Sequence, residues 1–165
     1  MHDLSLYLLE VLENAVSAGA SRVVTTIVAD RETDSLTMIV EDDGPGLPVP
    51  PAEAVDPFFT TKQGKKTGLG LSLFLQDAQA AGGGLRVGRS HDVGGVEVRA
   101  WMGLSHIDRP PVGDLALSFV TMMATNPEVD FTVVLANGDG RATLRGRELL
   151  GDASALLAFQ RSLEL

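Results

Sequence analysis

The sequence predicts an α+β chain made of one ordinary domain with a small appendage, and three observations lead to this expectation. Its 165 residues suffice for one domain and are too few for a complete two-domain enzyme. Segments with helical and with strand-like periodicity alternate along the chain. The consecutive prolines Pro110 and Pro111 then interrupt this alternation, because proline resists helix and favours extended chain. We therefore expect a domain over residues 1–107 and a small extension over residues 108–165.

The domain over residues 1–107 is expected to contain two helices, each followed by two strands. The helices have apolar residues at helical spacing, and the strands are rich in β-branched residues. In chain order the expected elements are a helix over 4–18, strands over 21–29 and 36–41, a loop over 49–68, a helix over 69–81, and strands over 85–89 and 96–102.

The extension is expected to form a helix, a hairpin and a second helix, over residues 113–125, 130–136 with 141–145, and 152–163. Asn137-Gly138 is a strong signal for the hairpin turn. Two roles remain open, a packing element that covers one edge of the sheet and a docking module for a protein partner. Arg141, Arg145 and Arg147 lie on or beside one expected strand, where they would either pair with an acidic partner or be solvated.

Composition excludes several classes of function. Twenty-two acidic against 13 basic residues give a net charge of −9, which disfavours binding to nucleic acid through its phosphates. No apolar run approaches the roughly 20 residues of a membrane span, and the N-terminus lacks the pattern of a secretion signal. The chain has no cysteine. We therefore expect a cytoplasmic protein that neither binds nucleic acid nor spans a membrane.

All three lysines of the chain fall within one glycine-containing segment, as Lys62, Lys65 and Lys66. Such a segment suits an anion-binding loop, because glycine lets backbone N–H groups approach a phosphate closely. A solvated loop with a chance cluster of lysines is the alternative. The neighbouring motifs have to decide between them.

Three short motifs carry candidate chemistry. Glu10 and Asn14 lie four residues apart on the first expected helix and so share one face of it. Residues 43–46, Asp-Gly-Pro-Gly, follow a strand, where glycines let a planar ligand approach and a carboxylate can accept a hydrogen bond. Residues 67–72 open the second helix, where free N–H groups and the helix dipole favour a phosphate. Taken singly, each motif is equally consistent with ordinary structure.

In this order the motifs resemble the ATP-binding fold shared by DNA gyrase, heat-shock chaperones, sensor histidine kinases and mismatch-repair ATPases, known as the Bergerat fold. The matching segments are residues 10–14, 43–46, 56–62 and 68–72, within residues 1 to about 104. The resemblance implies a two-layer α/β sandwich in which helices cover a mixed sheet. It also implies that the chain binds ATP and Mg²⁺.

The resemblance assigns roles to individual residues. Asn14 would hold Mg²⁺ against the phosphates, Asp43 would read the adenine amino group, and a lid from Lys62 to Gly70 would wrap the triphosphate. The implied nucleotide-binding residues are Asn14, Asp43, Gly44, Gly46, Thr61, Lys62, Gly64, Lys65, Thr67, Gly68, Leu69, Gly70 and Leu71.

Glu10 is the candidate catalytic residue. The first helix looks like that of the ATPases, in which Glu at this position activates water, whereas the lid looks like that of sensor histidine kinases. A Glu also occurs in related serine kinases, where it would deprotonate a hydroxyl. We therefore expect general-base catalysis by Glu10, with Lys62 or Lys65 offsetting charge on the γ-phosphoryl group. The acceptor, water or a protein hydroxyl, stays open, and a non-catalytic ATP-gated interaction module is the alternative.

The sequence departs from the family pattern at two places. Val96 stands where the family usually has the Thr of a Gly-Thr pair, which puts one adenine contact in doubt. That departure alone favours a third reading, a degenerate fold that no longer binds ATP. A phosphoacceptor helix is also missing, and His2, His91 and His106 are interpreted as surface histidines, so classical autophosphorylation is not expected.

Overall fold

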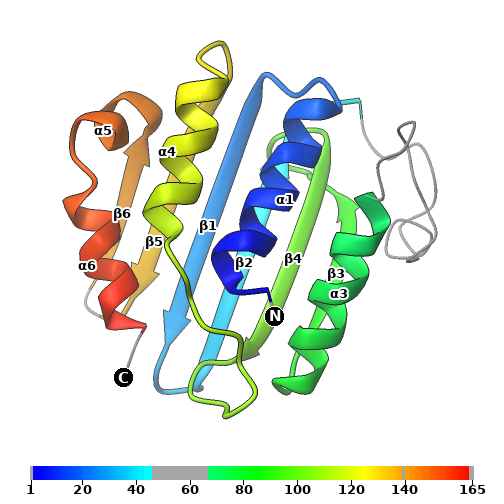
Figure 1. Cartoon of the computed structure of the whole chain (residues 1–165), viewed down its shortest axis with the longest axis vertical. Coiled ribbons are helices and arrows are strands. Elements are labelled where there is room, and N and C mark those ends of the chain that lie inside the picture. The colour runs from blue at the N-terminus through cyan, green and yellow to red at the C-terminus, as the bar shows by residue number, and fades with distance from the viewer. Residues whose placement is uncertain (1, 46–66, 139, 164–165) are drawn as a thin grey trace.

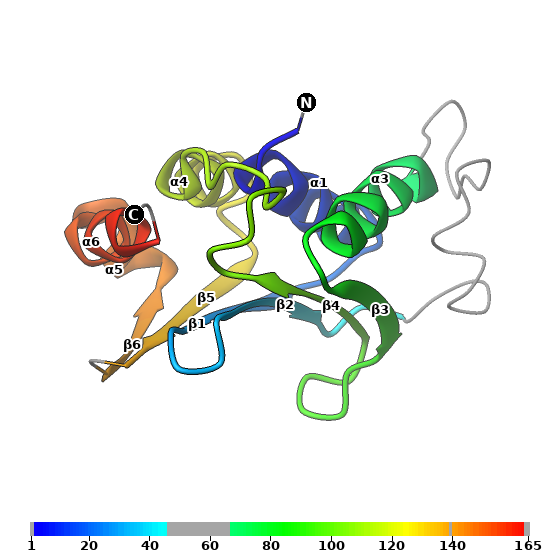
Figure 2. The same ribbon diagram turned by 90° about the horizontal axis from the view of Figure 1, so that it is seen from below.

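The computed structural model describes residues 2–45, 67–138 and 140–163. Their strands form one six-stranded sheet in the order β3-β4-β2-β1-β5-β6, and their helices all lie on one face of it (Figures 1 and 2). The elements are α1 (Leu4–Ser17), β1 (Arg22–Asp30), β2 (Ser35–Asp42), α3 (Thr67–Ala80), β3 (Gly84–Arg89), β4 (Val96–Gly103), α4 (Leu115–Thr125), β5 (Asp130–Asn137), β6 (Gly140–Arg145), α5 (Gly146–Gly151) and α6 (Ser154–Ser162). The expected α+β fold, a mixed sheet covered by helices, is confirmed.

Each expected helix and strand is present, with ends shifted by a few residues. One additional helix, the six-residue α5, was not predicted from the sequence. Glycines at both of its ends are typical of loops, so the sequence pattern does not indicate a helix here. In the fold, the Glu148 carboxylate accepts a bond from the backbone N–H of Arg145 at 3.5 Å and so helps to cap this helix. Most of the expected loop over 49–68 lies outside the described residues.

The extension continues the same sheet. β5 pairs in parallel with β1, with Val23 beside Phe131 and Ile27 beside Leu135, and all four of these side chains are buried. β6 then pairs antiparallel with β5 and forms the sheet edge. The position of β5 at the edge of β1 is the one that a packing extension requires.

The core is continuous across the whole chain. Helix α1 lies between α4 and α3 in the helical layer (Figure 2), and its Leu4, Leu8 and Leu12 are almost fully buried. The backbone N–H of Leu4 donates to the carbonyl of Pro111 at 2.8 Å, and the Ser118 hydroxyl donates to the carbonyl of Ser5 at 2.8 Å. Residues on both sides of position 108 therefore stabilise one another.

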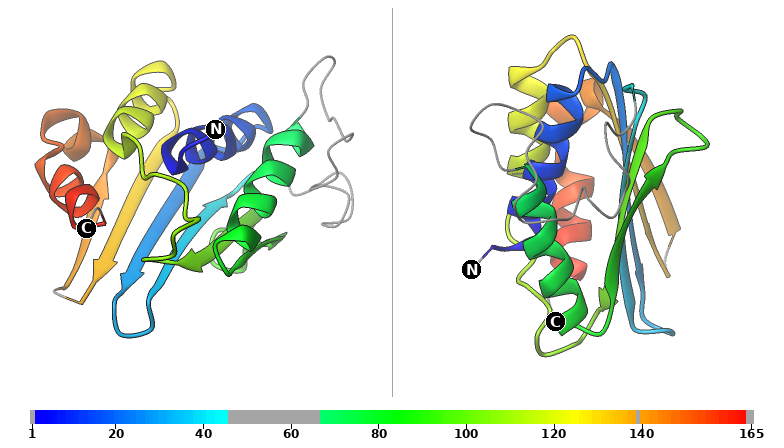
Figure 3. Two further views of the ribbon diagram at one scale, coloured as in Figure 1. Left: turned by 60° about the horizontal axis from the view of Figure 1, so that its bottom comes forward. Right: turned by 90° about the vertical axis from the view of Figure 1, so that its right-hand side faces the viewer.

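Two further features of the architecture bear on function. No helix covers the opposite face of the sheet, and the turn between β3 and β4 projects on that side (Figure 3). In addition, none of the helices in the described part of the chain is long and apolar enough to cross a membrane.

Candidate nucleotide-binding site

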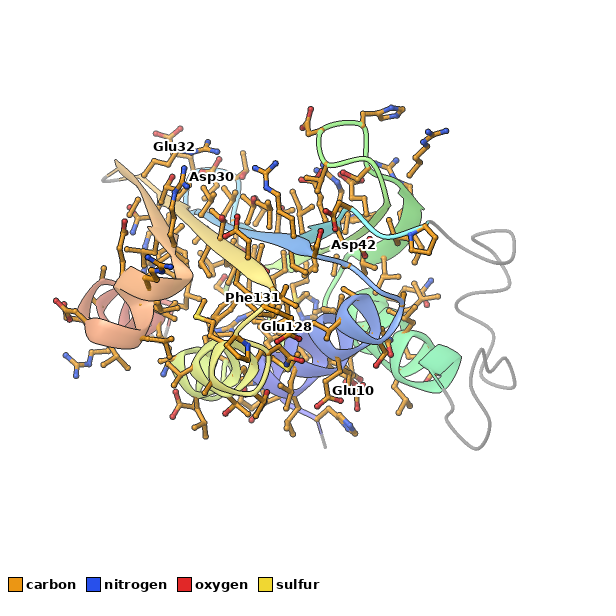
Figure 4. The ribbon with its side chains drawn as sticks, turned by 90° about the horizontal axis from the view of Figure 1, so that it is seen from above. Glu10, Asp30, Glu32, Asp42, Glu128 and Phe131 are labelled. Atoms are coloured by element: carbon orange, nitrogen blue, oxygen red, sulfur yellow. The ribbon has the colours of Figure 1, made fainter. Side chains whose placement is uncertain are left out.

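The candidate site lies at one end of the sheet, where α1 ends, β1 begins, β2 ends and α3 begins (Figure 1). Asp42 closes β2 within the sheet, and Glu10 projects from α1 in the helical layer (Figure 4). Gly44 lies against Ala20, the residue that links α1 to β1, since a Cβ at position 44 would stand 3.7 Å from the backbone N of Ala20. The strand end and the helix end are thus brought together.

Asp42 is a buried carboxylate held by backbone donors. Its Oδ1 accepts hydrogen bonds from the N–H of Gly44 at 2.9 Å and of Val96 at 3.3 Å. Burial raises the pKa of Asp42, and the two backbone hydrogen bonds oppose that rise. No bond to Oδ2 is present among the described residues, so this oxygen is the one available to a ligand.

Gly95 is required beside Asp42. A Cβ at position 95 would stand 2.5 Å from both the carbonyl oxygen and Oδ1 of Asp42, far closer than side chains tolerate. The Gly95 N–H donates to the Asp42 carbonyl at 2.8 Å. Because the next residue, Val96, reaches Asp42 through its backbone, the unexpected valine leaves this anchoring bond in place.

Asp43, the residue expected to read adenine, is exposed and engaged elsewhere. Its carboxylate accepts hydrogen bonds from the Ser21 hydroxyl at 2.6 Å and from the N–H groups of Ser21 and Arg22 at 2.8 and 2.9 Å. The Ser21 hydroxyl is the main reason that the pKa of Asp43 lies below its ordinary value. Asp43 therefore clamps the start of β1 to the end of β2.

The geometry favours Asp42 over Asp43 as the ligand-reading carboxylate, and the sequence held a signal for it. The inward-facing residues of β2 are Leu36, Met38, Val40 and Asp42, so an aspartate occupies a core position of the strand. Counting back from Gly44 and Gly46, the family spacing Asp-x-Gly-x-Gly also begins at Asp42.

Glu10 combines an engaged and an unengaged carboxylate oxygen. Oε1 lies 3.1 Å from Nε2 of His2. Oε2 is buried, and it has no hydrogen-bond partner among the residues that the structure describes. A buried acceptor without a partner is costly, so Glu10 is suited to accept a proton or hydrogen bond from a ligand.

An aromatic stack joins α1 to α3 next to Glu10. The Tyr7 ring packs between His2 and Phe74, with ring centroids 5.1 and 4.6 Å apart. The Tyr7 hydroxyl donates to the carboxylate of Asp77. Burial, reinforced by Asp77, raises the pKa of Tyr7, so the phenol stays neutral. Sequence reasoning missed this group because Phe74 is far from His2 and Tyr7 in the chain.

Asn14 lies one helical turn beyond Glu10 and is half-buried. Its side-chain amide makes no hydrogen bond to any described residue, which leaves its oxygen available. Across residues 2–45, 67–138 and 140–163, no three His, Asp or Glu side chains gather as a metal site would require.

Several expected nucleotide-binding residues lie outside the described residues: Gly46, Thr61, and Lys62, Gly64 and Lys65 of the expected lid. Residues 67–70 form the first turn of α3, which begins two residues earlier than expected. Leu71 packs into the core beside them. Its side chain therefore anchors the start of α3 in the core.

Residues 2–106 match the family model described as histidine kinase-, DNA gyrase B- and HSP90-like ATPase. The chain belongs to this family. Its first two thirds are thus an ATPase domain, which implies that the chain binds ATP. The match ends close to the boundary expected near residue 108, and the extension lies outside it.

Individual relatives agree with this assignment. The C4-dicarboxylate transport sensor protein DctB of Pseudomonas aeruginosa is 38% identical over 94 residues, which cover 53% of this chain and 15% of DctB. The chain therefore spans only a small part of that relative's length.

Solved structures share the fold. The ATPase domain of Aquifex aeolicus MutL complexed with ADP has a TM-score of 0.50 and 21% identity, covering 88% of this chain and 63% of that one. The N-terminal domain of a DNA repair protein has a TM-score of 0.56 and 13% identity, and the match covers 90% of this chain and 56% of that one. Both likenesses extend past residue 107, so they include part of the extension.

Proposed function

We propose that this ATPase-family chain binds Mg-ATP at the α1–β2–α3 end of the sheet and transfers the γ-phosphoryl group to water or to a protein hydroxyl. The observation that carries the proposal is the buried, unpartnered Oε2 of Glu10, one turn from the unengaged amide of Asn14. A carboxylate in this state is suited to take a proton from the attacking hydroxyl. A protein with this activity would work in the cytoplasm, where ATP is supplied.

Asp42 would bind the adenine amino group, in place of Asp43. Its Oδ1 is held by Gly44 and Val96, so the carboxylate is fixed, and the missing side chain of Gly95 lets the backbone pack directly against it. An ionised carboxylate accepts hydrogen bonds and so would select the amino group of adenine over the carbonyl of guanine.

Asn14 would supply a side-chain oxygen to Mg²⁺. Its free amide and the lack of a larger cation cluster in the described part of the chain fit an ion held chiefly by phosphates. When bound, the ion would neutralise charge on the triphosphate. Lys62 and Lys65 of the lid are proposed to add positive charge at the γ-phosphoryl group.

One observation favours a second candidate function. Oε1 of Glu10 already lies 3.1 Å from Nε2 of His2, so this oxygen is engaged within the protein and is not free to accept from an attacking hydroxyl. An ATP-gated interaction module with negligible turnover, acting on a partner through residues 108–165, is consistent with that pairing.

Phosphate release from Mg-ATP by purified protein, with Glu10→Gln beside the wild type, tests the proposal. Gln keeps the shape and an oxygen for His2 but cannot take a proton, so release should fall about 10²- to 10⁴-fold while ATP still binds. Glu13→Gln, an exposed neighbour on α1, is the matched control and should release phosphate at the wild-type rate.

Equal release by the wild type and Glu10→Gln would overturn the role of Glu10. No release by either, combined with intact Mg-ATP binding, would favour a protein acceptor or the ATP-gated module. Transfer of labelled γ-phosphate to added protein substrates would then separate these two.

A further inference from the structure

The face of the sheet away from the helices is a large, partly apolar surface, here called the open face (Figures 2 and 3). Val24, Val28 and Ile39 point to it and contribute nothing to the buried core. Trp101, the chain's only tryptophan, also lies there and is 38% exposed. Such a bare apolar sheet face is a marker of an interaction surface.

Strand pairing aligns the outward-facing residues of the open face in three rows that cross the sheet. Read from β3 to β6, the rows are Gly84–Trp101–Thr37–Val28–Ala136–Arg141, Arg86–Arg99–Ile39–Thr26–Val134–Thr143 and Gly88–Glu97–Glu41–Val24–Thr132–Arg145. On β2, β1 and β5 these residues are apolar or threonine except Glu41, and the other charged residues stand on β4, β3 and β6. An apolar centre with a polar rim is the usual composition of a protein interface.

The two edges are complementary in size. The outward-facing side chains of β6 are long, short and long, namely Arg141, Thr143 and Arg145. Those of β3 are short, long and short, namely Gly84, Arg86 and Gly88. A two-fold axis that runs along the strands between β2 and β1 would lay β6 of one copy over β3 of the other, row upon row. In that arrangement each long side chain meets a short one.

The edges are also complementary in chemistry. Arg145 would enter the space over Gly88, where an added Cβ has no atom within 4 Å, and would lie beside Glu97 of the partner subunit. Arg141 would lie over the indole of Trp101 of the partner subunit. That ring leans across Gly84, since a Cβ there would stand 3.0 Å from it. An ion pair and a cation–π contact would therefore form twice, once on each side of the axis.

We propose that the open face binds a second copy of this chain, face to face, in a two-fold symmetric dimer. Strands spaced about 4.8 Å apart and a height of about 26 Å give the face roughly 700 Å², close to the about 800 Å² per partner of a standard interface. The Nε atom of Arg99 is buried and has no partner among the described residues. In the dimer, Thr143 of the partner subunit would lie in the same row, and its hydroxyl would be available as an acceptor for this atom.

Gly88→Tyr gives the sharpest test. Position 88 has open space around it and no positive φ, so tyrosine fits the monomer and favours the strand, but it would fill the slot for Arg145. By light scattering across about 0.1–100 µM, a range that brackets interfaces of this size, we expect the wild type to reach about twice 17.4 kDa and Gly88→Tyr to stay monomeric. Gly88→Ala, the small control, should dimerise.

The unique tryptophan provides a second measurement. Its emission should shift to the blue as the wild type dimerises and should not change with concentration in Gly88→Tyr. Arg141→Ala should weaken dimerisation about tenfold or more, whereas Arg161→Ala on α6, at the other side of the molecule, should have no effect. A wild type that stays monomeric, or a dimer that survives both Gly88→Tyr and Arg141→Ala, would overturn the proposal.

Discussion

Because the carboxylate of Asp42 is buried, the charge that would bind a ligand also lowers the stability of the fold. Its pKa is raised because the carboxylate lies in the protein interior. A raised pKa means that Asp42 keeps its proton to a higher pH in the folded protein than in the unfolded chain. As the pH rises through that pKa, keeping the charged form in the fold costs stability.

Asp42→Asn should therefore keep or raise the free energy of unfolding. Oδ1 of Asn can still accept from Gly44 and Val96, and the neutral side chain removes the cost of the buried charge. Melting temperatures at several pH values check this, and the advantage of Asn should grow as the pH rises from below the ordinary aspartate range to neutrality. A large loss of stability at neutral pH would show that the charge itself holds the site together.

The contrast between Asp42 and Asp43 shows how far sequence reasoning reaches at single residues. Both carboxylates stand at the end of a strand and precede glycines, so the motif indicated a carboxylate here, and the sequence analysis gave the adenine-reading role to Asp43, whereas the buried carboxylate is Asp42. Their environments differ because Gly95 packs against Asp42, whereas Ser21 turns Asp43 outward. Both contacts join residues that are more than 20 positions apart, and no local pattern encodes them.

Among the elements, the clamp formed by Asp43 holds β1 and β2 together at the site. Its pKa is lowered, so the clamp stabilises the fold above the ordinary aspartate pKa and loses that contribution as the pH falls through the lower folded value. The clamp sets the position of Gly44 and hence of the loop that follows Asp42.

Asp43→Asn should lower stability at neutral pH, because the single amide oxygen can replace only one carboxylate oxygen as acceptor, and it accepts less strongly than a charged oxygen does. The difference from the wild type should vanish in acid, below the folded pKa of Asp43. Chemical denaturation at both pH values measures it, with the exposed Asp108→Asn as a control that changes little. A difference that persists in acid would mean that the clamp does not depend on charge.

The periodicity of the sequence predicted the elements, whereas the pairing of strands that are distant in the chain was not predicted. Alternation in residues 21–29 and 36–41 was enough for the first hairpin, and helical spacing was enough for α1. The parallel pairing of β5 with β1 joins residues more than 100 positions apart, so the sequence could propose a packing extension but not its partner strand.

For the whole molecule, the single sheet makes the extension part of the folding unit. Without it, β1 would become an unpaired edge, and α1 would lose the helix that packs beside it. Buried residues of α4 such as Phe119 belong to the same core as Leu8 and Ile27.

A chain truncated after residue 107 should therefore lose cooperative unfolding or aggregate. Circular dichroism on heating, compared with the full chain, checks this expectation. A truncated chain that unfolds cooperatively near the melting temperature of the full protein would show instead that residues 1–107 are an independent domain.

The central claim, that Asp42 reads adenine at this end of the sheet, is tested most directly by calorimetric titration of the wild type and Asp42→Asn with Mg-ATP and with Mg-GTP. The wild type should prefer ATP, and Asp42→Asn should lose about tenfold or more in ATP affinity, since a hydrogen bond to a charged acceptor is removed. Asp43→Asn, in contrast, should keep the preference. Equal binding of ATP and GTP by the wild type, or a preference lost with Asp43→Asn and kept with Asp42→Asn, would contradict the assignment.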